Sequence, residues 1–173
     1  MPVHDCINTV LIEVFDYPLA LSAQHYGAVT SFVLGVPDVA AESGFYKEVM
    51  GLDTVLEHRI AGPEIEKVIG LPPGAALLLR LMGHPEQPYG RAELIEYEGM
   101  PGKDLYPHAR PPALGSLLGR FETADLDAFV RHLGRCGIQV VELPAASLIF
   151  GRCRLAAFKS PAGFSIEVFQ RCA

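Results

Sequence analysis

Two glutamates are the side chains whose type and placement best suit chemistry in this chain. Glu93 lies in the run AELIEY and Glu167 lies in the run SIEVF, and both runs have the composition of β-strands. If the two strands lie side by side, the carboxyl groups approach each other beside Val33 and Leu118. Two carboxylates in an apolar site cannot both ionise cheaply, so one of them would become a general acid or base. Such a pair suits proton abstraction beside a carbonyl group, as in an isomerase or a lyase.

Arg120 and Phe169 are predicted to contact the same ligand. Arg120 follows Leu118 by two positions, so its guanidinium would either neutralise a glutamate or bind an anionic or enolic oxygen. Phe169 and Ser165 alternate with Glu167 on one strand. An aromatic side chain at that place is either core packing or a surface for a ligand.

A purely structural interpretation of the glutamates stays open. In it, Glu93 and Glu167 bind Arg80, Arg120 or Arg154 in a buried ion-pair network that has no catalytic role. The sequence does not indicate a phosphate-binding loop, because no glycine-rich GxGxxG run follows a strand. It does not indicate a nucleophilic triad either, because no serine or cysteine has a histidine and an acid at the required spacing.

A repeated β–α–β–β–β pattern is expected to position these side chains. In each half a strand leads to an aspartate that caps a helix, Asp38 or Asp125, and the helix ends at Gly51 or Gly137. The predicted strands are 29–36, 54–60, 75–82 and 91–98 in the first half and 118–123, 138–143, 154–159 and 164–170 in the second; a short helix is predicted after Pro63. The fold class is therefore α+β.

The domain organisation follows from the composition between the halves. Residues 99–112 are rich in proline and glycine, which is typical of a linker without regular structure. We predict an N-terminal arm or extra strand at 1–26, a first module at 27–98, this linker, and a second module at 113–173, all in one structural domain.

The composition and charge of the chain indicate what kind of partner the protein binds. Half of the 173 residues are apolar, the net charge is −6, and no run of lysine and arginine occurs, which argues against nucleic-acid and membrane partners and favours a small molecule.

The four cysteines are not spaced as metal ligands and are predicted to be reduced. The N-terminal apolar segment contains Glu13 and Asp16 and lacks a basic flank, so it is predicted to be neither a signal peptide nor a membrane span. A cytoplasmic location is expected.

The two halves resemble the vicinal oxygen chelate superfamily, which includes glyoxalase I, bleomycin-resistance proteins and extradiol dioxygenases. The resemblance is carried by VLGVPDVAAESGFYKEVMGL in the first half and by DLDAFVRHLGRCGIQVV and FKSPAGFSIEVFQ in the second, over roughly residues 28–170. It implies two βαβββ modules whose sheets curl into a cup around a ligand, and it suggests a homodimer in which the strand at 8–15 takes part. Phe45 is read as helix-to-sheet core and Tyr46 as half-exposed at best.

The resemblance also implies four metal-ligand positions, one on the first and one on the last strand of each module. Counting back from the caps, these positions hold Ser31 and Leu118, and the last-strand positions hold Glu93 and Glu167. Both carboxylates are present, but the histidines usual on the first strands are replaced by side chains that bind zinc, nickel or iron poorly. The cofactor is therefore unknown: a weakly held divalent ion such as Mg²⁺, or none.

A nitrogen ligand would have to come from another histidine. His25 and His108 are the candidates, although both are more simply read as exposed loop residues. On the second strand, alternation lets only one of His58 and Arg59 face the cup.

Three hypotheses remain for function. The first is a lyase or isomerase that uses Glu93 and Glu167 as acid and base on a small oxygenated molecule, with Ser31, Val33, Leu118, Arg120 and Phe169 contacting it. The second is a protein that binds and sequesters a small molecule without chemistry, as resistance proteins do. The third is a metal-dependent lyase or dioxygenase.

Overall fold

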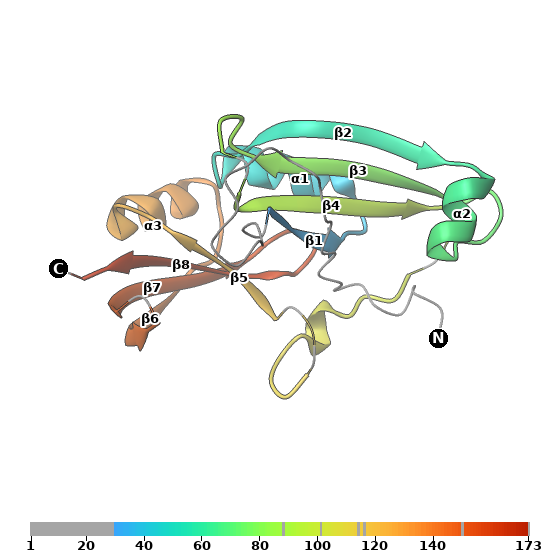
Figure 1. The fold of residues 1–173 in the computed structure, drawn as a ribbon. Coiled ribbons are helices and arrows are strands. Elements are labelled where there is room, and N and C mark those ends of the chain that lie inside the picture. The colour runs from blue at the N-terminus through green and yellow to red at the C-terminus, as the bar shows by residue number, and fades with distance from the viewer. Residues whose placement is uncertain are drawn as a thin grey trace, which may run out of the picture. The chain divides into compact units, whose positions relative to one another are not determined.

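The structure, a computed structural model, describes residues 30–87, 89–100, 102–113, 115, 117–149 and 151–172. The predicted N-terminal arm, its strand at 8–15 and His25 lie outside these residues. Packing divides the chain into two units between Lys103 and Asp104, and each unit is described by itself. The predicted pair of βαβββ modules is confirmed, with one additional short helix in the first (Figure 1).

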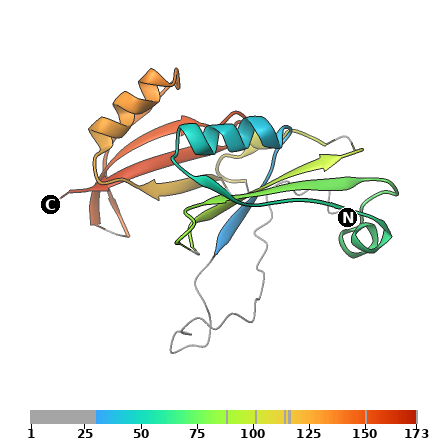
Figure 2. The same cartoon turned by 90° about the horizontal axis from the view of Figure 1, so that it is seen from above.

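The first unit is a four-stranded mixed sheet, sheet A, with one helix on one of its faces (Figure 2). Its elements are β1 (Ser31–Gly35), α1 (Val39–Glu48), β2 (Asp53–Ala61), α2 (Pro63–Ile69), β3 (Ala76–Gly83) and β4 (Arg91–Glu98). The strand order is β1-β4-β3-β2; β1 runs parallel to β4, and the other neighbours are antiparallel.

The second unit repeats this arrangement in sheet B. Its elements are a 3-10 turn (Tyr106–His108), β5 (Leu118–Glu122), α3 (Leu126–Arg135), β6 (Val141–Leu148), β7 (Gly151–Lys159) and β8 (Ser165–Arg171). The order is β5-β8-β7-β6, again with one parallel pair, β5 and β8. The turn lies in the predicted linker, where no regular structure was expected; Tyr106 is buried there and its ring contacts that of Phe164.

Both main helices begin as the sequence predicts. The Asp38 side chain accepts a hydrogen bond from the Ala41 amide at 2.8 Å, and the Asp125 side chain accepts one from the Ala128 amide at 2.9 Å. Each carboxylate thereby satisfies an amide that has no partner within its own helix. The starts of the two helices, from which the positions of Ser31 and Leu118 are counted, are therefore fixed by local chemistry.

The helix ends are also duplicated. Gly51 has φ +70° and Gly137 has φ +73°, a left-handed conformation that glycine adopts without strain. The following amides donate back into the last turn, Leu52 to the Tyr46 carbonyl and Ile138 to the Leu133 carbonyl. The chain consequently leaves both helices along the same path.

Two predictions about the core and the strands are wrong in detail. Tyr46 is fully buried, with its ring edge-on to that of Phe45 at 5.5 Å, so both aromatics belong to the core between α1 and sheet A. The sixth strand begins at Val141 rather than 138 and extends to Leu148, because the ladder with β7 is interrupted between Leu143 and Ala146 and then resumes. A bulge of this kind lets a strand pass through a proline.

Among the residues that the structure describes, no helix is long and apolar enough to cross a membrane.

Candidate functional site

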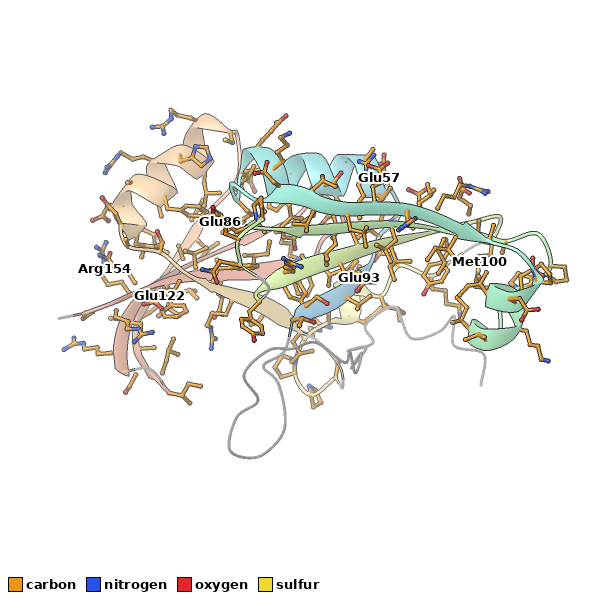
Figure 3. The ribbon with its side chains drawn as sticks, turned by 45° about the horizontal axis from the view of Figure 1, so that its top comes forward. Glu57, Glu86, Glu93, Met100, Glu122 and Arg154 are labelled. Carbon is orange, nitrogen blue, oxygen red and sulfur yellow. The ribbon has the colours of Figure 1, made fainter. Side chains whose placement is uncertain are left out.

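Glu93 lies on the face of sheet A that points away from α1. The strand register places Val33, Glu93, Leu81 and Leu56 in one row across the four strands, and we call the face that carries this row the Glu93 face (Figure 3). The alternate residues of each strand point to the other face of the sheet, which α1 covers. On β4, for example, the Glu96 carboxylate accepts a hydrogen bond from the Val39 amide of α1 at 2.8 Å.

The surroundings of Glu93 are mostly aliphatic. Glu93 is only 7% exposed, and Val33 and Leu81 are its neighbours on β1 and β3. The same face continues into an apolar cluster that includes Ile95 and Leu77, against which Ile65 and Ile69 of α2 and partly buried residues of the sheet pack. Little of the Glu93 side chain contacts water, and burial of a carboxyl group is costly and is typical of functional acids.

His58 and Tyr97 add polar groups to the Glu93 face. His58 pairs with Leu79, which pairs with Ile95, so of His58 and Arg59 it is the histidine that lies on this face, with its side chain exposed. Arg59 points to the other side and binds Glu98 at 2.7 Å. Tyr97 is half-buried on the Glu93 face, and burial raises the pKa of its phenol above the usual 10.0.

Ser31 lies at the end of the Glu93 face, opposite Arg91. The Arg91 side chain runs across Gly83 on the neighbouring strand: a Cβ atom at Gly83 would lie 2.5 Å from Arg91 Cγ. Arg91 Nε donates to the Gln87 carbonyl at 3.0 Å. Ser31 is therefore paired with an arginine rather than with a second metal-binding residue, and the side chain of that arginine extends toward β3, away from β1.

Glu167 occupies the corresponding place in sheet B but has a different neighbour. The register places Arg120, Glu167, Ala157 and Val141 in one row, on the side away from α3, and we call this side the Glu167 face. Arg120 donates to Glu167 Oε2 from both Nε, at 2.8 Å, and Nη2, at 2.5 Å. The carboxylate is therefore held by a charge-assisted pair of bonds.

Phe169 lies one row further along the Glu167 face. It is 5% exposed and packs with Cys153 and Leu155, so it is part of a core cluster. In the same region Arg171 binds Glu122, which Figure 3 labels on β5, at 2.8 Å. Leu118, at the other end of β5, is 37% exposed.

The remaining arginines that sequence reasoning considered bind other groups. Arg80 lies on the α1 side of sheet A, where it contacts Glu57 at 3.1 Å and donates to the Ser43 hydroxyl at 2.7 Å. Arg154 binds Asp127 of α3, and this contact lowers the pKa of the Asp127 carboxyl below its usual value. Glu93 and Glu167 belong to different units, so the predicted pairing of their carboxyl groups stays a prediction.

The residues at the four expected ligand positions do not fit a metal with nitrogen ligands. Ser31 offers a neutral hydroxyl, Leu118 offers no donor, and Glu167 Oε2 is bound by Arg120. Within the described ranges, no three side chains of histidine, cysteine, aspartate or glutamate come together as a possible metal site. His108 lies in the 3-10 turn of the second unit and is exposed.

Lys159 is a residue of the Glu167 face that sequence reasoning missed. It pairs with Ser165, which pairs with Leu118, so these three form the row next to that of Arg120 and Glu167. Alternation along β7 could have indicated this position, because Lys159 follows Ala157 by two residues and side chains two residues apart lie on the same face of a strand.

Comparison with known proteins adds to this picture. No family model and no curated protein sequence matches the chain. Solved structures do match: a glyoxalase family protein from Bacillus cereus superposes with a TM-score of 0.71 at 21% identity, over 89% of this chain and 100% of that one. TnmS3, an antibiotic-binding protein from Streptomyces sp. CB03234, has a TM-score of 0.52 at 18% identity, over 85% and 98% of the two chains.

A third match is a glyoxalase I mutant from Zea mays, with a TM-score of 0.55 at 15% identity; it covers 83% of this chain and 45% of that one. At identities of this size, the superpositions show a common fold only. The chain therefore has a glyoxalase-like fold.

Proposed function

We propose that this protein binds a small organic molecule through side chains of the Glu93 and Glu167 faces. The observation that carries the proposal is the bond between Arg120 and Glu167: the carboxylate at an expected metal-ligand position already has a guanidinium as its partner. With Ser31 and Leu118 at the first-strand positions, the polar contacts to a ligand would come from the protein itself.

The composition of the two faces supports the same proposal. Ligand sites are mostly apolar surfaces with a few fixed polar groups. The Glu93 face has aliphatic rows around one carboxyl group, and the Glu167 face has an arginine–glutamate pair beside Leu118 and Val141, which are 37% and 61% exposed. The antibiotic-binding protein of the same fold is consistent with a binding role.

A screen of neutral aromatic and amphipathic compounds tests this proposal. Saturable binding, detected by thermal shift and by NMR line broadening, should be weakened by Leu56→Gln on the Glu93 face or by Val141→Gln on the Glu167 face. Val68→Gln is the matched control, because Val68 is 77% exposed on α2 and lies on neither face. Binding that responds equally to all three substitutions would contradict the proposal.

A second candidate function, acid–base catalysis, is favoured by the burial of Glu93. A carboxylate that is 7% exposed between Val33 and Leu81 is suited to remove a proton from carbon beside a carbonyl. The electron pair of the broken C–H bond would move to the carbonyl oxygen. When the electron pair returns from the oxygen, uptake of a proton on the opposite face of the same carbon would give an epimer, and departure of a leaving group with its bonding electrons from the neighbouring carbon would give a lyase product. Glu167, held by Arg120, would serve as the second acid or base.

Substitution of Glu93 separates catalysis from binding. Glu93→Gln keeps the size of the side chain but removes the base, so turnover of any substrate found should fall by about two orders of magnitude or more while affinity changes little. Glu64→Gln, on the exposed start of α2, is the control. Unchanged turnover in Glu93→Gln and in Glu167→Gln would refute the catalytic role.

The quaternary structure and location are part of the proposal. We propose a homodimer in the cytoplasm, in which the segment at 8–15 contributes to the contact. Light scattering at micromolar concentration should give the mass of two chains, and a monomer mass would refute the dimer.

A further inference from the structure

One end of the Glu167 face carries a net positive charge, whereas at the other end Arg171 and Glu122 balance each other. The row of Leu118, Ser165 and Lys159 crosses β5, β8 and β7, and Arg120 lies in the next row on β5. We call Arg120, Ser165, Lys159 and Leu118 together the cationic end. Glu167 is the only carboxylate among the described residues of these two rows, so two cations stand against one anion.

Lys159 has no acidic partner among the described residues. It is the last residue of β7, its side chain is exposed, and the ion pairs of this part of the sheet join Arg120 to Glu167 and Arg171 to Glu122. An ammonium group without a carboxylate partner is free to bind an anion from solution.

Arg120 also retains donor capacity. Its bonds to Glu167 leave from Nε and Nη2 and end on the same oxygen, Oε2. A guanidinium has five N–H donors, so Nη1 and the outer hydrogen of Nη2 stay available for a second acceptor. The Arg120 side chain is 33% exposed, so solvent reaches part of it.

The register places these donors around one small residue. Neighbouring strands in a sheet are about 4.8 Å apart, so the strands of Lys159 and Arg120 lie about 10 Å apart with β8 between them. Ser165 is the β8 residue between Leu118 and Lys159, and in the next row Ala157, a small residue, is the β7 partner of Glu167. An oxygen anion above Ser165 is within reach of the long side chains on both sides, and the Ser165 hydroxyl points to the same face.

We propose that the cationic end binds the carboxylate of a small organic acid, with Arg120 Nη1, Lys159 Nζ and the Ser165 hydroxyl as its donors. This inference rests on the proposed ligand-binding function and names the class of ligand. The apolar body of the acid lies against Leu118, which is 37% exposed. One surplus positive charge matches a singly charged carboxylate, whereas a doubly charged phosphate would be left with an uncompensated negative charge beside Glu167.

The test compares benzoate with its neutral analogue benzamide on the intact protein. Titrations followed by NMR and calorimetry should show benzoate binding more tightly than benzamide. Lys159→Gln should weaken benzoate binding about threefold to fivefold, as expected for one partly solvated charge pair, and leave benzamide binding unchanged. Ser165→Ala should weaken benzoate binding by a similar factor. The matched control is Lys67→Gln, on the exposed surface of α2, which should change neither.

The outcomes separate this inference from the proposed function. If benzamide and benzoate bind equally and Lys159→Gln has no effect, the carboxylate site is refuted while small-molecule binding stands. If neither probe binds at millimolar concentration, the carboxylate site is refuted as well, and the screen of neutral compounds decides the proposed function separately. If inorganic phosphate binds more tightly than benzoate, the assignment to carboxylates is wrong. Because Lys159 is exposed, loss of folding does not confound its substitution.

Discussion

Arg120 and Glu167 face each other across β5 and β8, and Arg120 Nε donates to Glu167 Oε2 at 2.8 Å. The same register position in sheet A holds Val33 opposite Glu93. The duplicated modules therefore keep one glutamate position, with an aliphatic cross-strand neighbour on β1 in sheet A and a cationic cross-strand neighbour on β5 in sheet B.

Removal of Arg120 should destabilise the protein. The Glu167 side chain is 16% exposed and would lose the donors that compensate its charge, so Arg120→Gln should cost about 1–3 kcal/mol in the free energy of unfolding. The double variant Arg120→Gln/Glu167→Gln should recover part of this loss. Urea denaturation gives these values. The control is Arg59→Gln, which breaks the exposed pair with Glu98 and should cost less than about 1 kcal/mol; equal losses from the two arginine substitutions would contradict this reasoning.

The two helix caps should each contribute measurably. Asp38→Ala and Asp125→Ala each remove one acceptor for an amide of the first turn, and each should cost about 1 kcal/mol by chemical denaturation. Asp38→Asn and Asp125→Asn retain an acceptor and should cost less. Loss of stability in the asparagine variants equal to that in the alanine variants would show that charge, rather than the hydrogen bond, is responsible.

Two glycines should respond to alanine in opposite directions. Gly44 lies inside α1, where a Cβ atom would meet no neighbouring atom within 4 Å, so Gly44→Ala should stabilise the protein by about 0.5–1 kcal/mol. Gly83→Ala should destabilise it, because the new methyl group would overlap Arg91 Cγ. The double variant Gly83→Ala/Arg91→Ala should relieve the overlap. Thermal unfolding measures all three, and a stable Gly83→Ala variant would show that Arg91 moves aside without cost.

The pair of Asp127 and Arg154 should make stability depend on pH in the acid range. The hydrogen bond from Arg154 lowers the pKa of Asp127 in the folded state below the ordinary 3.8. Because the pKa of Asp127 is lower in the folded chain than in the unfolded chain, its ionised form stabilises the fold. This contribution is complete at a pH above the pKa of the unfolded chain, and it is lost as the pH falls through the pKa of the folded chain. Asp127→Asn should therefore flatten the decline of the urea midpoint below about pH 4. Because both side chains are exposed, the change should be small; an unchanged decline would show that other carboxyl groups cause it.

The features of the fold that could be predicted from the sequence depend on interactions between residues close together in the chain. Asp38, Asp125, Gly51 and Gly137 act through hydrogen bonds and backbone angles within a few residues, and the structure confirms each of them. The sequence predicts a start of the sixth strand at 138, but β6 begins at Val141, because pairing with β7 decides where the strand begins.

The candidate site depends more on partners that are distant in sequence. Alternation alone placed Arg120 on the side of Leu118, but its choice of Glu167 as partner depends on the parallel pairing of β5 with β8. Lys159 had no motif to mark it, and only the antiparallel register with β8 brings it beside Ser165. Tyr46 is expected from the sequence to be half-exposed at best, but it is fully buried where α1 packs on sheet A.

The interruption in β6 has a consequence for self-association. β6 is an edge strand of sheet B, and Pro144 lies in the stretch between Leu143 and Ala146 where the ladder with β7 breaks. Proline has no amide hydrogen to give to an incoming strand, and a bulge twists an edge away from the flat geometry that strand addition needs. The β6 edge is thus protected against pairing with an edge strand of another copy of the protein. Val141 can therefore be 61% exposed on β6 without making this edge a site of aggregation.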